Sequence, residues 1–310
     1  MPKLSVEIPE KLKPYAFHGV DLHWKESDKE AVGECPWCGR ENKFFVSLET
    51  GQWRCVVCQE GTAKGGGNSY VFLRLLWQES MQAAKNQERL YQELAADRGL
   101  MRTATLKRWG LAPSILTGDW LVPGYSVDGK INQVYRYLKR GDRKAQVPTS
   151  GHGHQLFGLS HYDAKKTVNY LAEGVWDAMC LEEHLTCAKL EKDGSLSPTS
   201  SIKQSLLANA CVLAVPACSV FFNAWSVLFA SKTVNLMYDN DHPRKHPRTN
   251  KEISSAGFEG MKRVALILSQ SSAPPSQINY LRWGETGYDL SLPSGYDVRD
   301  KLAGATCRIP

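Results

Sequence analysis

Two short acidic motifs follow apolar runs that are typical of buried strands. Glu173-Gly-Val-Trp-Asp177 follows the run 167–172, and Asp239-Asn-Asp241 follows the run 233–238. In an open α/β sheet, ligands bind at the carboxyl ends of the strands. Carboxylates gathered there suit Mg²⁺ or Mn²⁺, hard cations that can also hold phosphate oxygens. The two motifs therefore predict a site for metal-assisted phosphoryl transfer.

The elements expected around these motifs alternate between strand and helix. They are a strand at 167–172, a helix at 175–187, a strand at 211–215, a helix at 223–230, a strand at 233–238, a helix at 256–269 and a strand at 278–283. Such alternation predicts a parallel sheet with helices on its faces. The first and third strands then end close together, so that Glu173 and the pair Asp239 and Asp241 share one site.

Three further carboxylates accompany these motifs. Asp177 lies one helical turn after Glu173, at a helix N-terminus, where a negative charge is favourable. Asp297 and Asp300 follow late in the chain. Either of these two is a further ligand at the same site or an ordinary cap or turn residue.

Four of the nine cysteines form two Cys-x-x-Cys pairs, Cys35/Cys38 and Cys55/Cys58. The segment between the pairs predicts a β-hairpin with a Glu-Thr-Gly turn. Two such pairs across a hairpin predict one tetrahedral Zn²⁺ site that is structural, because all four ligand positions are filled. His18 or His23 in place of one cysteine is the less favoured alternative. We expect the aromatic and basic residues of the hairpin to form its core on one face and to contact nucleic acid on the other.

The middle of the chain combines a linker, helices and a basic hairpin. The glycine-rich segment 61–67 lacks the Gly-Lys-Ser/Thr ending of a P-loop. Helices are expected from Asn68-Ser69 onward and over 83–96, and a hairpin turn at Asp128-Gly129. The second strand of this hairpin runs into a basic cluster that suits a nucleotide or a template backbone: Arg136, Lys139, Arg140, Arg143 and Lys144. Protective charge on an edge strand is the equally favoured alternative.

Composition sets broad limits on the class of protein. The 310 residues are 42% hydrophobic and 23% charged, with a net charge of +6, as in ordinary globular proteins. No apolar run of about 18 residues occurs, so we expect no membrane span. The first residues lack the apolar core of a signal peptide, and a cytoplasmic location is expected, in a bacterium or a phage-infected cell.

Taken in order, the motifs resemble those of DNA primases. Glu173-Gly-x-x-Asp177, Asp239-x-Asp241 and Ala256-Gly257 are similar to the Toprim domain of topoisomerases, primases and some nucleases. The cysteine quartet resembles the zinc module of DnaG-type primases, and Tyr135-Arg-Tyr-Leu with 155–159 resembles the basic subdomain of phage-type primases. The resemblance implies a multidomain α/β protein, in which the Toprim sheet is Rossmann-like, with helices on both faces. Its expected parts are a zinc ribbon with an N-terminal extension (1–67), a helical linker (68–100), a small α+β basic subdomain (101–165) and a Toprim catalytic domain (166–310).

The same resemblance implies a function in DNA replication, as part of a primosome. It implies a DNA-directed RNA polymerase that makes short primers on single-stranded DNA from ribonucleoside triphosphates by two-metal nucleotidyl transfer. Glu173, Asp177, Asp239 and Asp241 are the implied catalytic residues, and Glu173, Asp239, Asp241 and Asp297 the implied ligands of Mg²⁺ or Mn²⁺. A Toprim nuclease and a non-catalytic single-stranded-DNA-binding factor are the alternatives.

Two departures from the family pattern stand out. Residues 242–255 form a basic insertion beside the metal site where the family keeps a tight turn, and it is either a grip for template or triphosphate or a solvated loop. The chain also carries no helicase-binding domain or motor after the Toprim segment, so a separate helicase is the expected partner. This short form fits a phage, plasmid or mobile-element origin.

Overall fold

The computed structural model describes residues 7–58, 64–141, 143–191, 196–245, 248–285 and 287–303. The chain folds into two compact units, each assembled from separated stretches of sequence. The first, here the cysteine unit, comprises residues 1–87, 110–124 and 130–154; the second, the carboxylate unit, comprises 88–109, 125–129 and 155–310. The expected multidomain α/β class is confirmed, because antiparallel sheets and a parallel sheet flanked by helices are both present.

The cysteine unit opens with a five-stranded antiparallel sheet in the order β1-β2-β3-β4-β5. Its strands are β1 (Leu22–His23), β2 (Glu30–Gly33), β3 (Phe44–Ser47), β4 (Trp53–Cys55) and β5 (Gly66–Gly67). The predicted hairpin is confirmed as β3 and β4, which pair Val46 with Trp53. Gly66 and Gly67, expected in a linker, instead form the edge strand β5, and residues 61–63 of that linker lie outside the described residues.

Aromatic side chains form the core beneath this sheet. Helix α2 (Ser69–Ala83) begins where the Asn68 side chain accepts a hydrogen bond from the Val71 N–H at 3.1 Å, as the sequence predicts. From α2, Phe72 packs against Tyr15 of α1 (Lys13–Phe17), with ring centroids 4.8 Å apart. Phe44 stacks on Trp53 at 5.3 Å, and both side chains are buried. The expected hydrophobic face of the hairpin is therefore the core of the unit.

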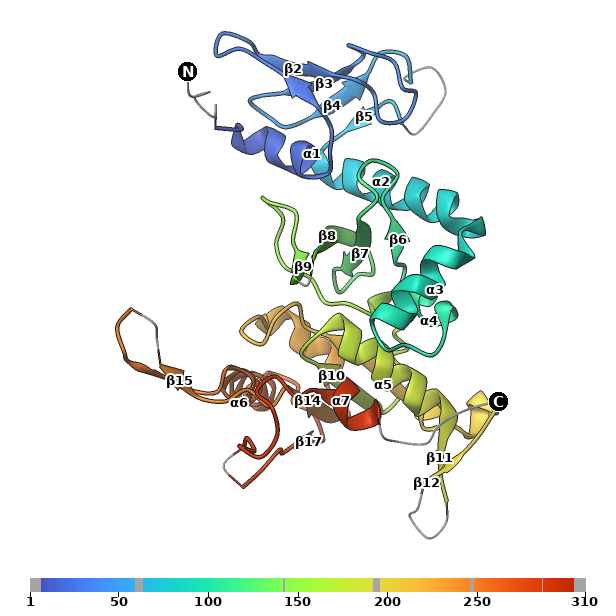
Figure 1. Cartoon of the computed structure of the whole chain (residues 1–310), viewed down its shortest axis with the longest axis vertical. Helices are drawn as coiled ribbons and strands as arrows, with labels where there is room; N and C mark the ends of the chain where they lie inside the picture. Colours follow the sequence, from blue (N-terminus) through green and yellow to red (C-terminus); the bar gives the residue numbers. More distant parts are fainter. Residues whose placement is uncertain are drawn as a thin grey trace. The chain divides into compact units, whose positions relative to one another are not determined.

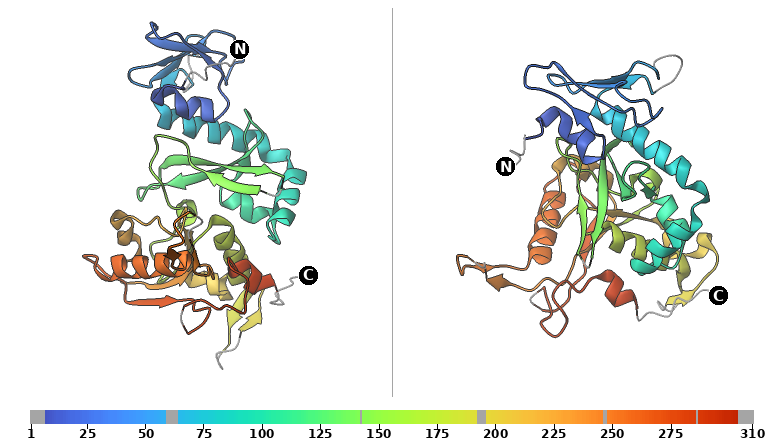
Figure 2. Two further views of the ribbon diagram at one scale, coloured as in Figure 1. Left: turned by 60° about the vertical axis from the view of Figure 1, so that its left-hand side comes forward. Right: turned by 45° about the horizontal axis from the view of Figure 1, so that its top comes forward.

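A second antiparallel sheet in the cysteine unit has the order β6-β7-β8-β9 and is drawn in green in Figure 2. Its strands are β6 (Ala112–Pro113), β7 (Trp120–Tyr125), β8 (Ile131–Arg140) and β9 (Arg143–Val147). The turn predicted at Asp128-Gly129 is present, and Gly129 adopts the positive φ of 78° that favours glycine. Its N–H donates to the Ser126 carbonyl at 2.8 Å.

The carboxylate unit is built on a parallel sheet with the order β13-β10-β14-β17, of which Figure 1 labels β10, β14 and β17. The four strands are β10 (Val168–Ala172), β13 (Ala210–Ala214), β14 (Thr233–Met237) and β17 (Gln277–Tyr280). Helices α5 (Val175–Cys187) and α6 (Ala256–Ser269) match their predicted bounds. The segment expected as a helix at 223–230 is a 3-10 helix, η6 (Asn223–Phe229). The first and third strands pair directly, as predicted, with Ala172 opposite Met237.

Smaller elements surround this sheet. They are α3 (Glu88–Asp97), α4 (Thr103–Arg108), η3 (Leu159–His161), the hairpin of β11 (Ala188–Leu190) and β12 (Leu196–Pro198), the hairpin of β15 (Arg244–Lys245) and β16 (Glu252–Ile253), and α7 (Val298–Ala303). The helix expected over 83–96 is divided between the end of α2, a 3-10 turn η2 (Ala84–Asn86) and α3. Among the described helices, none has the length and apolarity needed to cross a membrane.

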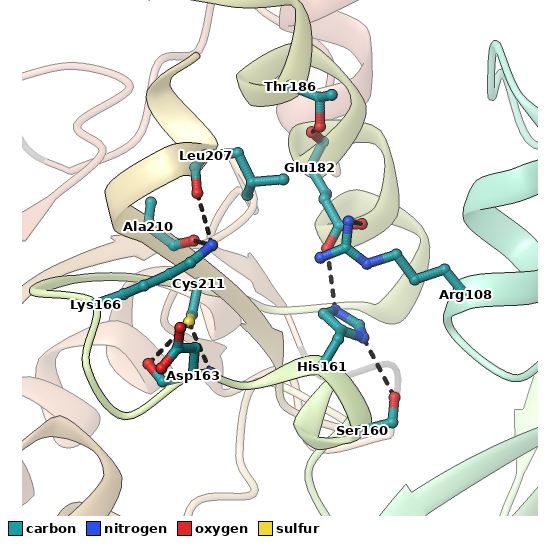
Figure 3. Close-up of polar contacts among 10 residues, drawn as sticks. All are labelled: Arg108, Ser160, His161, Asp163, Lys166, Glu182, Thr186, Leu207, Ala210 and Cys211. Atoms are coloured by element: carbon teal, nitrogen blue, oxygen red, sulfur yellow. Dashed lines mark hydrogen bonds and ion pairs between the residues drawn. The ribbon is translucent and has the colours of Figure 1, made fainter. Parts of the chain in front are cut away.

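A buried ion pair ties three of these elements together away from the strand ends (Figure 3). Glu182 of α5 is 3% exposed, and its carboxylate lies 3.0 Å from His161 Nε2 of η3. Arg108 at the end of α4 lies 3.5 Å from the same carboxylate group. Because two basic groups face it, the buried Glu182 has its charge compensated within the unit. We assign this cluster a structural role.

Candidate functional site

The four predicted zinc ligands converge in the cysteine unit. The sulfur atoms of Cys35 and Cys58 are 3.8 Å apart, as are those of Cys38 and Cys55, and all four lie within 4.8 Å of one another. A Zn–S bond of about 2.3 Å gives a tetrahedron with S···S edges of about 3.8 Å. The group is therefore consistent with one structural zinc ion.

Among the described residues, neither histidine considered as a ligand, His18 or His23, belongs to this metal-binding group. His18 is buried, and its Nε2 lies 2.8 Å from Thr149 Oγ1. The Thr149 hydroxyl donates its own hydrogen to the Val134 carbonyl at 2.6 Å, so His18 Nε2 is the donor in the first bond. This neutral imidazole belongs to the packing of the unit, and burial lowers its pKa to about 3.

In the carboxylate unit, Glu173 and Asp239 lie side by side because their strands are neighbours. Each follows the end of its strand, β10 or β14, and the Asp239 N–H donates to Glu173 Oε2 at 3.3 Å. Helix α6 approaches closely here at Gly257, where a Cβ atom would lie 2.5 Å from the Asp239 carbonyl oxygen. A side chain at this position would push α6 away from the two carboxylates.

Asp241 is held by the start of the same helix. The Gly257 N–H donates to Asp241 Oδ2 at 2.9 Å, and the Ser255 side chain caps α6 by accepting from the Phe258 N–H at 3.3 Å. The partial positive charge of a helix N-terminus favours a carboxylate in this place. The predicted opening of a helix at Ala256-Gly257 therefore positions the third strand-end carboxylate.

Asp177 and Asp297 are joined by an arginine. Asp177, 5% exposed on the first turn of α5, lies 2.7 Å from Arg299 Nε, and Arg299 also pairs with Asp297. Asp297 caps α7 by accepting from the Asp300 N–H at 3.1 Å, while Asp300 accepts from the Asp297 N–H at 3.2 Å. The capping role considered for Asp297 and Asp300 is thus present, and metal binding by Asp297 stays a prediction.

The electrostatics of the strand ends favour a bound cation. Burial, with the charges of Glu173 and the neighbouring aspartates, raises the pKa of Asp239 to about 10. Burial also raises the pKa of Glu173 to about 7, with Asp241 and Asp177 adding repulsion. Within the described part of the chain, Asp239 Oδ1 is buried without a hydrogen-bond partner. A buried carboxylate that faces other carboxylates takes up a proton, as this raised pKa implies, unless a cation compensates its charge.

The donor set therefore fits Mg²⁺ or Mn²⁺ in its chemistry, since all donors are carboxylate oxygens. The carboxylates are nevertheless less closely gathered than the cysteines. Among the residues that the structure describes, only the four cysteines form a group of potential metal ligands whose ligand atoms all lie within 4.8 Å of one another. A cation would have to draw the strand-end carboxylates together.

Two residues of this site were not identified from the sequence. Asn240 is fully buried between the two aspartates, and its side-chain amide donates to the Asp289 carbonyl at 2.9 Å and accepts from the Asp289 N–H at 2.7 Å. It thereby fixes the loop that leads to Asp297. Arg299 compensates Asp177. The only sequence signals were an amide between two acidic residues and a basic residue between Asp297 and Asp300.

The basic cluster lies on β8 and β9 of the cysteine unit. In the register of the two strands, Lys139 is opposite Lys144 and Arg140 is opposite Arg143. The side chains of Lys139, Arg140 and Lys144 are exposed. Residues opposite each other on paired strands lie on the same face, so the exposed side chains of Lys139 and Lys144 share one face of the hairpin.

Arg136 differs from the rest of this cluster. Its guanidinium donates to Asp119 Oδ2 from Nε at 3.1 Å and to the Phe17 carbonyl, and it lies over the Phe17 ring at 5.0 Å. The side chain is 16% exposed. These contacts occupy it within the unit, so substitution of Arg136 would test folding as much as ligand binding.

The comparison with known proteins yields solved structures alone. No protein-family model and no curated protein matches the chain. The chain is similar to the zinc-binding and RNA polymerase domains of the Aquifex aeolicus primase (15% identity, 97% of this chain and 81% of that one, TM-score 0.43) and to a DnaG catalytic core (13%, 76% of each chain, TM-score 0.49). It is also similar to the primase fragment of the bacteriophage T7 primase-helicase protein (15%, 88% and 94%, TM-score 0.40). The expected likeness to DnaG-type and phage-type primases is thus found in structure.

Proposed function

We propose that the protein is a DNA primase that joins ribonucleotides into short RNA primers on single-stranded DNA. The observation that carries this proposal is the carboxylate group at the ends of β10 and β14, where Asp239 Oδ1 is buried without a partner. A four-cysteine group and a basic hairpin occur in the same chain, and the basic side chains suit the phosphates of a nucleic-acid template.

In this proposal Glu173, Asp239 and Asp241 hold Mg²⁺ or Mn²⁺, with Asp297 as a further ligand. The cation, when bound, neutralises charge that develops on the reacting phosphate. Gly257 N–H keeps Asp241 in place, and Arg299 holds Asp177 against α7. As the alternative to binding the cation, Glu173 assists removal of the proton from the primer 3′-hydroxyl.

The remaining parts serve the template and the nucleotides. A structural zinc on Cys35, Cys38, Cys55 and Cys58 stabilises the ribbon, which contacts single-stranded DNA. The exposed residues Lys139, Arg140 and Lys144, together with Arg143, bind phosphates of template or ribonucleoside triphosphate. A separate replicative helicase is the proposed protein partner.

The test is ribonucleotide incorporation on circular single-stranded DNA with Mg²⁺. We expect the wild-type protein to make short RNA products. Asp239→Asn should reduce synthesis by at least about a hundredfold, as is typical when a group that stabilises the transition state is lost. DNA binding by this variant, measured by fluorescence anisotropy, should be retained.

Two outcomes would contradict the proposal. Cleavage of the DNA without RNA synthesis would identify a nuclease that uses the same carboxylates. If the wild-type protein and Asp239→Asn both bind DNA, and neither makes RNA or cleaves DNA, the protein is a non-catalytic binding factor.

A further inference from the structure

The basic insertion, residues 242–255, forms a hairpin of its own, here called the basic arm. Strands β15 and β16 pair Arg244 with Ile253 and Lys245 with Glu252. In Figure 1 and the right-hand view of Figure 2, the arm projects away from the parallel sheet and from α6. Residues 246 and 247 are outside the described part of the chain.

Both ends of the basic arm are fixed at the carboxylate site. It begins directly after Asp241, and the His242 N–H donates to Ser294 Oγ at 3.0 Å. It ends at Ser255, the cap of α6, two residues before the Gly257 N–H that binds Asp241. The base of the arm therefore has a defined position relative to the carboxylates.

Two cations of the arm, Arg244 and Lys251, are not compensated by the described part of the protein. Arg244 and Lys251 are exposed, and neither forms an ion pair with any residue that the structure describes. Elsewhere in the unit, Lys189 lies 3.0 Å from Glu191 and Lys262 lies 2.7 Å from Glu259. Side chains alternate along a strand, so Arg244 and Lys251 share one face of the arm, whereas Lys245 faces Glu252 on the other. One face of the arm thus carries uncompensated positive charge.

The length of the arm limits what this face can reach. Arg244 is the third residue after Asp241, so an extended chain at about 3.3 Å per residue places it at most roughly 10 Å from Asp241 along the arm. Phosphates on one strand of a duplex are about 3.4 Å apart along the axis, so this distance corresponds to about three nucleotides. A neutral solvated loop would connect Asp241 to α6 equally well, but it would not place the unpaired cations Arg244 and Lys251 beside the carboxylate site.

We propose that the Arg244–Lys251 face of the basic arm binds the phosphate backbone of the nucleic acid held at the carboxylate site. The inference rests on the proposed function and adds to it a second phosphate-binding surface, separate from the β8–β9 hairpin. The arm contacts several nucleotides' worth of backbone without reading sequence, since arginine and lysine contacts to phosphate carry no base information.

The test compares two full-length double variants with equal loss of charge. Arg244→Gln with Lys251→Gln removes the proposed contacts. Lys165→Gln with Lys203→Gln is the control, because both lysines are exposed and Lys165 precedes the amino end of β10, at the opposite edge of the sheet. Affinity for a labelled oligonucleotide, single-stranded and with an annealed RNA primer, is measured at increasing salt.

Each lost phosphate contact should make the slope of log affinity against log salt shallower by about 0.7 on single strands. For the arm variant the slope should therefore change by about 1.4. When the salt concentration rises fourfold, the fold-loss of affinity should then be roughly sevenfold smaller for the arm variant than for the wild type. The control should keep the wild-type slope. An unchanged slope in the arm variant, or an equal change in the control, would overturn the inference.

Two further results separate this inference from its alternatives. A higher KM for ribonucleoside triphosphates with an unchanged DNA slope would assign the arm to the nucleotide and overturn the inference. If the wild-type protein makes no RNA, the proposed function fails, while the salt dependence of DNA binding still decides the role of the arm.

Discussion

At the scale of single residues, the site is defined by carboxylates that the protein does not compensate. Asp177 and Glu182 are both buried, and each faces a basic partner, Arg299 or the pair His161 and Arg108. Asp239 has no such partner among the described residues. A buried acceptor left unsatisfied costs about 1–3 kcal/mol, and more when charged, so its presence indicates a function that needs it.

His18 gives a prediction of pH dependence in the cysteine unit. Its imidazole donates through Nε2, and Nδ1 is buried without a partner in the described structure, so protonation is opposed by burial and by Arg136. The pKa in the folded state is about 3, below the ordinary 6.5. The unfolded chain therefore binds a proton first, and the stability contributed by neutral His18 is lost as pH falls below 6.5.

We expect this loss to approach about 1.4 kcal/mol per pH unit. His18→Gln keeps a donor for Thr149 but cannot titrate. Urea unfolding of both proteins at pH 7, 6 and 5 measures the difference, and zinc release at acid pH affects both alike. Parallel pH profiles would show that His18 is not a neutral buried group.

At the scale of elements, the sequence predicts well those elements that carry a long hydrophobic pattern. Helices α5 and α6 have their predicted bounds, and β10 and β14 differ from theirs by one residue. Strands β1, β2 and β5 have two to four residues, too few for a periodic signal, and they exist because the sheet pairs them. Asn240 and Arg299 were missed for a related reason, since their partners lie about fifty and more than a hundred residues away.

The basic hairpin has two interpretations, binding of template or nucleotide and protection of an edge strand, and one substitution can separate them. Strand β9 is at the edge of its sheet, where lysine also guards against aggregation. Lys144→Gln changes one exposed side chain of this hairpin, so its melting temperature should change little. If the hairpin binds template, the salt slope of DNA binding should become shallower by about 0.7.

The matched control for this variant is Lys85→Gln, an exposed lysine in η2. It should alter neither melting nor DNA binding. Should Lys144→Gln aggregate while binding DNA with wild-type affinity and slope, the edge-strand interpretation holds and the template role of the hairpin is wrong.

At the scale of the whole molecule, the chain passes repeatedly between the cysteine unit and the carboxylate unit. Residues 88–109 belong to the carboxylate unit, although residues 69–83 before them and 110–124 after them belong to the cysteine unit. The sequence predicts domains that are each one continuous segment of the chain, and those boundaries stay a prediction. Sequence patterns place elements along the chain, whereas a unit is defined by contacts between distant elements.

The division into units predicts how the molecule responds to loss of zinc. The cysteine quartet lies next to the aromatic core of its unit, since Trp37 between Cys35 and Cys38 packs on Phe72 of α2, with ring centroids 5.8 Å apart. A structural zinc supplies folding free energy, on the order of 10 kcal/mol in small zinc modules. Its removal should therefore unfold the first sheet and loosen α2.

Hydrogen exchange with and without a chelator measures this response element by element. Amides of β3, β4 and α2 should lose protection, while those of β10, β14 and α5 should keep it, because the parallel sheet has its own core of Leu171, Leu213 and Leu236. A variant with Cys38→Ser and Cys58→Ser should show the same pattern without chelator. Equal loss of protection in β10 and β14 would mean that the two units unfold as one, despite their separate cores.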